Sequence, residues 1–315
     1  MSLLDENIHK RIIKKKVVLD AHRPFDPIFL KRLKHELMIE YTYNSNAIEG
    51  STLTLNETRL VLEEGLTIGS KPIQDSLGAK NHPAAINFIE KLVYENTPLT
   101  EEAVLKLHSL ILHDIGDYAG VYRKVGVRIA GATFSPPKSA EIPGLINELL
   151  KWLDKNLEEY SPIEQAAFFH HKFVYIHPFS DGNGRTARLL MNAILMKSGY
   201  PFIINITQKE RKKYLDSLQE ADLGNYKPFI NYIARSAENA LDIYLNALEE
   251  PKIITLTQAS KITSYSVNYL GLLARKGRIG AFKENNRWYV REQEIINYEK
   301  EMKYKQLKRE GALDE

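Results

Sequence analysis

Residues 177–188, which read HPFSDGNGRTAR, constrain the fold of this 315-residue chain more than any other stretch. Glycines at 182 and 184 allow backbone conformations that other residues avoid, and they let an anion approach the N–H groups closely. The apolar residues from Ala187 to Leu195 predict a buried helix, so the glycine turn lies at its N-terminus. Unpaired N–H groups and the helix dipole favour phosphate there. The run therefore predicts a phosphate-binding turn that begins a core helix.

Four side chains in this run suit phosphoryl or nucleotidyl transfer. His177 is the side chain best matched to proton transfer near neutral pH. Asp181 is the kind of hard ligand that Mg²⁺ takes together with phosphate oxygens and water. Arg185 and Arg188 are three residues apart on the predicted helix and therefore project from one side of it. The run thus combines a general base, a metal ligand and two arginines.

Three other interpretations of the same residues compete with this one. Residues 182–187 also fit the dinucleotide fingerprint. That fingerprint needs a preceding strand inside a βαβ unit. The short β-like run 173–176 does precede these residues, but no βαβ pattern surrounds it. His170, His171 and His177 match no usual zinc spacing, and two of them are expected on the preceding helix as packing or surface residues. The sequence contains no Walker-type loop, which argues against P-loop ATPase chemistry.

Composition describes an ordinary soluble globular protein, with 43% hydrophobic and 26% charged residues. The absence of cysteine excludes disulfides and thiolate metal sites and fits a reducing cytosol. No apolar stretch approaches eighteen residues and the N-terminus has no signal-peptide core, so we expect a cytoplasmic protein without a membrane partner. The net charge of +3 is uneven, because residues 252–291 hold eight Lys and Arg against one acid.

Apolar periodicity predicts a mostly helical protein. Residues 1–26 are basic and weakly patterned, which predicts a partly ordered N-terminal arm. Alternating apolar residues within 125–134 predict a β-hairpin. A helical domain over 27–250 ends at Glu249-Glu250-Pro251. Its helices are predicted over 27–43, 56–65, 82–95, 100–113, 141–158, 161–175, 184–198, 207–221 and 226–248.

The run 177–188 resembles the signature of the Fic family, His-Pro-Phe-x-Asp/Glu-Gly-Asn-Gly/Lys-Arg-x-x-Arg, at all nine specified positions. The resemblance implies a Fic-type helical bundle with a small β-hairpin flap. It also implies transfer of AMP from ATP, with Mg²⁺, to a Tyr, Thr or Ser hydroxyl of a target protein, with self-modification expected as well. In that reaction His177 would be the catalytic base and Asp181 the metal ligand. The nucleotide- and phosphate-binding residues would be Gly182, Asn183, Gly184, Arg185, Thr186, Arg188 and Tyr214, the last at an inexact spacing.

Two further segments resemble parts of the Fic pattern. Ser45, Glu49 and Gly50 match the inhibitory motif, which would lie on a helix near 40–50. In the family that glutamate pairs with the second motif arginine, here Arg188, and excludes a productive γ-phosphate. The predicted hairpin corresponds to the flap that aligns a target segment by strand pairing. Its candidate docking residues are Val127, Arg128, Ile129, Ala130 and Gly131.

Residues 251–300 predict a small α+β module followed by a charged tail over 301–315. Two short helices and a two-strand wing with an Asn-rich turn resemble a winged helix-turn-helix, often appended to bacterial Fic proteins. Its basic excess suits nucleic acid. The expected recognition helix, 267–274, is however largely apolar, so DNA binding and a dimer or protein contact through 252–300 both stay open.

Other activities stay open beside AMP transfer. The same site would support removal of AMP from a modified target, with Glu49 aligning a water molecule. Transfer of UMP or phosphate is a second alternative. The third belongs to another class of protein, a DNA-binding regulator in which the Fic domain senses a nucleotide.

Overall fold

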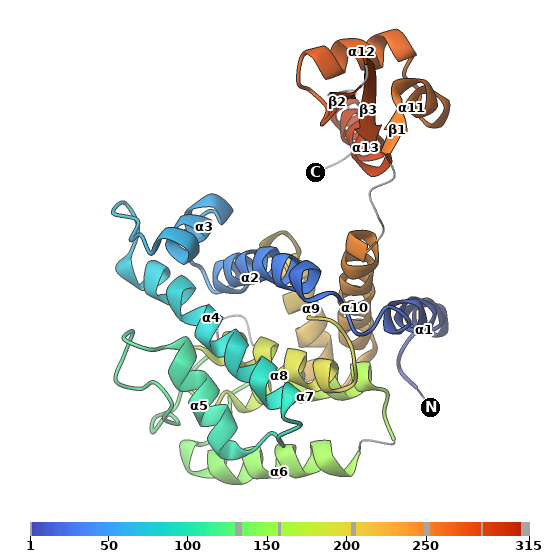
Figure 1. Ribbon diagram of the computed structural model, residues 1–315. Coiled ribbons are helices and arrows are strands. Elements are labelled where there is room, and N and C mark those ends of the chain that lie inside the picture. The colour runs from blue at the N-terminus through green and yellow to red at the C-terminus, as the bar shows by residue number, and fades with distance from the viewer. Residues whose placement is uncertain are drawn as a thin grey trace. The chain divides into compact units, whose positions relative to one another are not determined.

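The computed structural model describes residues 2–129, 134–156, 159–202, 206–248, 253–284 and 286–309. The chain divides into two compact units, Met1–Leu245 and Asn246–Glu315. The first unit is helical and the second combines helices with a three-stranded sheet (Figure 1). Among the described residues, no helix has both the length and the apolar character needed to cross a membrane.

Most helices of the first unit follow the predicted order, and several begin at side-chain caps. Thr100 accepts from the Ala103 N–H, and Ser161 closes a capping box with Glu164. The elements are α1 (Glu6–Asp20), α2 (Pro27–Ile48), α3 (Leu55–Glu64), α4 (Ile73–Tyr94), α5 (Glu101–Ile111), the 3₁₀ turn η1 (Ser139–Glu141), α6 (Ile142–Lys155), α7 (Pro162–Ile176), α8 (Asn183–Lys197), the 3₁₀ turn η2 (Gln208–Glu210), α9 (Arg211–Asp222) and α10 (Lys227–Leu248).

Helix α8 lies at the centre of this unit (Figure 1). Twelve of its fifteen residues are buried, and it contacts α7, α4, α5 and α2. Its apolar residues between Ala187 and Leu195 lie on several sides of the helix, so neighbouring elements have to cover more than one face. Its N-terminus, which carries the glycine turn, is therefore enclosed by neighbouring helices. The predicted core helix is confirmed within one residue at each end.

Helix α4 begins nine residues before its predicted start at residue 82. Gly78 and Pro83, two poor helix formers, lie inside it. Gly78 packs closely, because an added Cβ would lie 3.2 Å from Asn46 Oδ1, a tight contact, and 3.5 Å from Arg185 Nη1. Tertiary contacts thus override the local preference that made the sequence prediction stop short.

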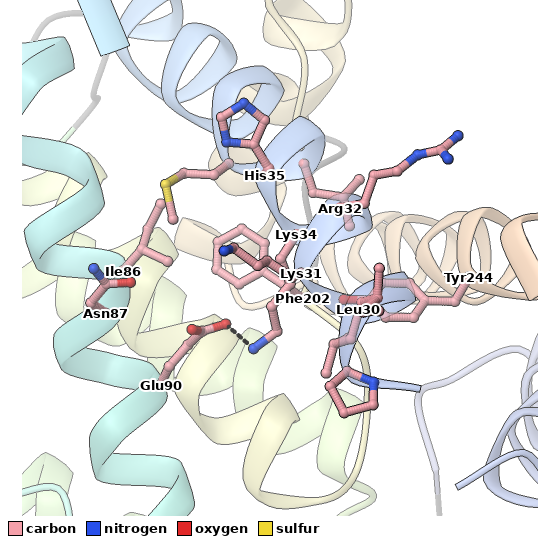
Figure 2. A pocket seen from close by; sticks show the side chains of 14 residues that line it. Leu30, Lys31, Arg32, Lys34, His35, Ile86, Asn87, Glu90, Phe202 and Tyr244 are labelled. Atoms are coloured by element: carbon pink, nitrogen blue, oxygen red, sulfur yellow. Dashed lines mark ion pairs between the residues drawn. The ribbon is translucent and has the colours of Figure 1, made fainter. Parts of the chain in front are cut away.

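The carboxyl-terminal half of α2 is packed more tightly than its beginning. Its buried residues all fall between Leu37 and Ile48. Beneath the first half lies a pocket of about 730 Å³ between α2, α4, Phe202 and Tyr244, with Lys34 paired to Glu90 at 2.7 Å (Figure 2). The end of α2 that carries the predicted inhibitory motif is therefore the end that the core holds.

The expected N-terminal arm contains a regular helix, which corrects the prediction for residues 1–26. Helix α1 starts at Asp5, whose carboxylate accepts from two N–H groups, and it buries Ile8, Ile12 and Leu19. Arg11 and Lys15 also bind Glu238 of α10. The Arg11 guanidinium, supported by Lys15, lowers the pKa of the Glu238 carboxyl to about 2. Only three residues of α1 are buried, and Glu238, the partner of its basic residues, is more than 200 positions away, so the local pattern for a helix is weak.

Replacing Ile12 with alanine tests whether α1 is part of the core. We expect Ile12→Ala to lower the free energy of unfolding by about 2–5 kcal/mol, since deletion of a buried side chain leaves a cavity. Ile12 is fully buried, whereas Ile13 is 43% exposed, so Ile13→Ala is a matched control that should change stability by about 0.5 kcal/mol or less. Urea unfolding followed by circular dichroism measures both. Equal effects of the two variants would mean that α1 does not dock.

The second unit contains β1 (Ile253–Thr255), α11 (Leu256–Ile262), α12 (Val267–Arg275), β2 (Phe282–Glu284), β3 (Arg287–Arg291) and α13 (Glu292–Arg309). Its antiparallel sheet has the order β1-β3-β2, with Ile254 opposite Val290 and Lys283 opposite Trp288. Two helices and a hairpin were predicted; β1 was not. Residues 301–309 of the expected tail continue α13, helped by i,i+4 pairs such as Lys305–Glu301. The winged-helix assignment stays a prediction.

Candidate active site

The glycine turn gives α8 an N-terminus that no larger residue would form. Gly182 has a φ of 73° and directly precedes the helix, in the left-handed region that favours glycine. An added Cβ there would lie 3.2 Å from both His108 Nε2 and Leu112 Cδ1. The first N–H groups of α8 have no acceptor inside the helix, which suits an anion, and phosphate binding there stays a prediction.

Asn183 and Thr186 are buried and hold the turn together. The Asn183 side chain accepts from the Phe179 N–H and donates to the Phe179 carbonyl, both at 2.9 Å. The Thr186 hydroxyl donates to the Gly182 carbonyl at 2.9 Å. These side chains fix the shape of the turn, so their expected contribution to phosphate binding would come through the backbone.

The two motif arginines bind two different carboxylates. Arg185 Nη2 lies 3.0 Å from Asp181 Oδ2. Arg188 is 1% exposed, and its Nη2 lies 2.7 Å from Glu49 Oε1. Arg188 also donates from Nε to Ser45 Oγ at 3.1 Å and from Nη2 to the Ser45 carbonyl at 2.8 Å. The structure thus brings the predicted inhibitory residues Ser45 and Glu49 onto the predicted arginine.

The Glu49 carboxylate lies over the first turn of α8. An added Cβ at Gly184 would overlap Glu49 Oε1. Burial has the largest single effect and would lower the pKa of Arg188, but Glu49, Tyr214 and Tyr41 together outweigh it and the pKa is raised. A carboxylate therefore occupies an anion site formed by a buried guanidinium and a helix N-terminus. Gly50, with a φ of 99°, follows Glu49 and ends the α2 segment.

Two contacts that the sequence did not predict hold this end of α2. Arg211 at the beginning of α9 donates from Nε to the Ile48 carbonyl at 2.8 Å. A cation at a helix C-terminus both satisfies an unpaired carbonyl and suits the dipole. Asn46 donates from Nδ2 to the Thr42 carbonyl and lies 3.3 Å from His82 Nδ1 of α4. Glu49 is thus presented by an anchored helix end.

His177 ends α7 in the left-handed conformation, with a φ of 51° and a ψ of 59°. Its N–H donates to the Phe173 carbonyl at 3.0 Å. Nδ1 lies 3.2 Å from the Val174 carbonyl, an oxygen that only accepts, so Nδ1 carries the proton in the neutral ring. The lone pair is then on Nε2, where a general base needs it.

The surroundings of His177 keep the imidazole neutral. Burial lowers the pKa of His177 below its usual value, and the Arg123 guanidinium acts in the same direction. The Val174 carbonyl, Glu49 and Asp181 oppose this without reversing it. A neutral ring with a free Nε2 is able to accept a proton near neutral pH.

His108 is a further site residue that the sequence did not reveal. Its Nδ1 accepts from the Gly120 N–H at 2.8 Å, and its Nε2 donates to the Asp181 carbonyl at 2.9 Å. The ring stacks on Phe179 at 3.6 Å. Burial lowers the pKa of His108 to about 4, as this pattern of one accepted and one donated bond requires. A lone histidine on an apolar helix face carries no local sign of this role.

Asp181 is suited to a metal ion that enters the site already bound to a phosphate ligand. It is less suited to a metal site formed by protein side chains alone. Its side chain is 52% exposed, and its oxygens accept from the Gly182 N–H and from Arg185. The described residues include no group of three or more His, Cys, Asp or Glu side chains arranged to hold a metal. Mg²⁺ commonly takes one or two carboxylates and completes its shell with phosphate and water. One half-exposed carboxylate beside a phosphate site meets that requirement.

The remaining predicted site residues lie as follows. Val127, Arg128 and Ile129 are described and form no strand, while Ala130 and Gly131 lie outside the described residues, so the hairpin stays a prediction. Tyr214 is 3% exposed and its hydroxyl lies 2.8 Å from His170 Nε2, inside the core. Its nucleotide contact likewise stays a prediction.

Two of the competing interpretations can now be judged. Residues 173–176 are the last turn of α7, so the strand that a dinucleotide fingerprint needs is replaced by a helix. His170 and His171 lie on α7 as expected and bind different partners, Tyr214 and Asp222. The histidines therefore act separately in the core.

Comparison with known proteins agrees with this geometry. Residues 98–195 match the model of the Fic/DOC family. Protein adenylyltransferase Fic of Aedes aegypti is 37% identical over 250 residues, which are 78% of this chain and 49% of that protein, and the Nematostella vectensis protein of that name is 37% identical over 225 residues. The chain spans about half the length of these curated relatives.

Solved structures extend the agreement to the fold. A Fic domain containing signaling protein from Bacteroides thetaiotaomicron is 32% identical, with a TM-score of 0.69 over 77% of this chain and 96% of that one. Fic-1 from C. elegans is 32% identical, with a TM-score of 0.67 over 77% of this chain and 73% of that one.

Proposed function

Because the chain belongs to the Fic/DOC family, we propose that it is a protein adenylyltransferase, which moves AMP from ATP to a Tyr, Thr or Ser hydroxyl of a target protein and of itself. One observation carries the proposal. The Glu49 carboxylate lies on the Arg188 guanidinium and over the first turn of α8, where an anionic phosphate would bind. His177, whose Nε2 has no hydrogen-bond partner among the described residues, caps the helix that leads into the same turn.

In the proposed reaction the phosphates of ATP lie over residues 182–185, and Arg185 and Arg188 bind them. His177 Nε2 removes the proton of the target hydroxyl while its oxygen forms a bond to the α-phosphorus. The bond from that phosphorus to the bridging oxygen breaks and pyrophosphate leaves. Asp181 would hold the magnesium ion of the nucleotide, whose charge would offset that of the phosphates. Preorganised N–H groups and guanidinium groups do the same from fixed positions.

The same geometry accounts for the proposed autoinhibition. A carboxylate and a phosphate oxygen compete for one guanidinium fork, and a charge-assisted pair in a partly dry site is strong. Glu49 competes effectively with a phosphate oxygen because the anchored end of α2 already holds its carboxylate against Arg188. A nucleotide that binds against Glu49 would place its γ-phosphate unproductively.

Labelled nucleotides test the proposal against its alternatives. The purified chain is incubated with magnesium and with ATP labelled at the α- or the γ-phosphate. AMP transfer requires label in protein from α-labelled ATP only, whereas label from γ-labelled ATP would show phosphate transfer, and label from UTP would show UMP transfer. Loss of label from a previously modified target on addition of the chain would show AMP removal instead.

We further propose that the second unit binds duplex nucleic acid. Its seven cationic side chains on α11, α12, the sheet and the turns between them are all exposed, and only Arg291 has an acidic partner among the described residues, at 3.4 Å. These residues are Lys261, Arg275, Lys276, Arg278, Lys283, Arg287 and Arg291. Such a surface neutralises phosphates and releases counterions.

Salt dependence tests this second proposal. The affinity of the full chain for a labelled 25-base-pair duplex should fall linearly with salt on logarithmic axes, and removal of one phosphate contact, as in Arg278→Gln, should reduce the slope by about 1. Fluorescence anisotropy measures it. Absence of binding at low salt would contradict the proposal. A concentration-dependent dimer that is lost in Tyr269→Ser would instead assign the exposed apolar residues of α12 to a self-contact.

A further inference from the structure

One buried guanidinium connects the segment between α5 and η1 to the catalytic end of α7. Arg123 is 3% exposed, and its four acceptors are all main-chain carbonyl oxygens. It donates from Nε to His177 at 2.7 Å, from Nη1 to Val125 at 2.9 Å, and from Nη2 to Pro137 at 2.6 Å and to Ile176 at 3.4 Å. Its own N–H donates to the Pro178 carbonyl at 3.0 Å.

These hydrogen bonds supply partners for carbonyl groups that have none within α7. The last carbonyls of a helix have no partner inside the helix, and they form its negative end. Arg123 satisfies the carbonyls of Ile176 and His177 from one planar group. The left-handed conformation of His177 is unfavourable for a residue with a side chain and persists only where its surroundings impose it. Arg123 holds the backbone of His177 from one side while the Phe173 carbonyl holds it from within α7.

We propose that Arg123 is a positioning residue, which fixes the imidazole of His177 relative to Val125 and Pro137 by binding the main-chain carbonyls of all three residues. This inference rests on the proposed AMP transfer. It predicts an effect on turnover and little effect on ATP binding, since none of the described contacts of Arg123 is with α8. Lysine cannot replace it, because an ammonium group lacks the planar fork that reaches four carbonyls at once.

The charge of Arg123 gives a second readout. Three charged groups face His177 from the elements around it: Arg123, Glu49 of α2 and Asp181 of the glycine turn. Of these, only Arg123 lowers the pKa of His177. Removal of the guanidinium should therefore raise that pKa, so that the acid limb of the transfer rate lies at higher pH. A merely structural role would not move this limb.

The experiment uses the full chain in a Glu49→Gly background, with Arg123→Gln, Arg123→Lys and the control Lys124→Gln, which changes the exposed neighbouring side chain. We expect Arg123→Gln to lower kcat roughly 10- to 100-fold, because small misplacements of a catalytic group have effects of this size. The KM for ATP should stay within about threefold of the value for the Glu49→Gly background. Its acid limb should move to higher pH. Arg123→Lys should restore the limb but not kcat.

The outcomes separate this inference from the proposed function. If Lys124→Gln transfers AMP and both Arg123 variants match it in kcat and pH profile, Arg123 has no positioning role. If the Glu49→Gly background itself transfers nothing, the proposed function has failed. Circular dichroism reports folding. If Arg123→Gln does not fold, Arg123→Lys carries the test, and full kcat in that variant overturns the proposal.

Discussion

Glu49→Gly is expected to raise the rate of AMP transfer roughly 10- to 100-fold, the factor that loss of one hydrogen-bonded charge pair implies. The substitution removes the carboxylate that lies 2.7 Å from Arg188 Nη2 and leaves the guanidinium free for phosphate. Ser45 still holds Arg188 in place through Nε and Nη2. The fold should persist, because the Glu49 side chain is 38% exposed and follows the last residue of α2. Initial rates of label incorporation from α-labelled ATP measure the effect.

A matched control separates this effect from a general loosening of a helix end. Glu64 ends α3 and is followed by Gly65, as Glu49 is followed by Gly50. Glu64→Gly should leave the rate at the wild-type level. Glu49→Gln, which keeps the shape of the side chain but not its charge, should give an intermediate rate. Equal rates for wild type and Glu49→Gly would contradict autoinhibition by this pair.

The part of the candidate site that could be predicted from the sequence is the part formed by consecutive residues. The motif 177–188 dictates its own local structure: glycine allows the turn, apolar residues bury the helix, and the histidine and arginines are then fixed in relation to both. The contact between Glu49 and Arg188 joins residues far apart in the chain, and it followed only from the family resemblance. Periodicity alone predicted most helices of the first unit, but it missed α1 and did not show which helix ends meet.

His108, Arg123 and Arg211 could not be predicted, for a common physical reason. Each acts chiefly through main-chain carbonyls of distant segments: His108 through Asp181, Arg123 through His177 and Pro137, and Arg211 through Ile48. A carbonyl is present at every residue, so no side-chain pattern marks the partner.

The errors in the fold have a related cause. Helix α1 was missed because its narrow apolar stripe gains its partners from α10. The predicted α4 was too short because Gly78 and Pro83 look like breaks, whereas Gly78 lies inside the helix and packs closely against Asn46 of α2. In both cases the energy that decides the structure comes from contacts across the core, which local preferences do not contain.

His177→Ala in the Glu49→Gly background is expected to lower AMP transfer by about 10² to 10⁴, the usual contribution of a general base. ATP binding should stay within a few-fold, because the phosphate site is formed by the α8 N-terminus and the two arginines. The rate of the parent variant should fall at acid pH as His177 gains a proton. Since burial lowers the pKa of His177, this acid limb should lie below the usual pKa of histidine. The negative charge of Glu49 raises the pKa of His177, so removal of Glu49 should move the acid limb to still lower pH.

The exposed His113, at the end of α5, provides the control, and His113→Ala should transfer AMP at the parent rate. Isothermal titration with ATP and magnesium separates binding from chemistry in the same samples. If His177→Ala loses both binding and transfer, the histidine supports the phosphate site rather than proton removal. If it keeps transfer within a few-fold of the parent, another group removes the proton. Loss of transfer with binding retained, together with loss of the acid limb, is the result expected for a base that acts through Nε2, the ring nitrogen that the described carbonyls leave free.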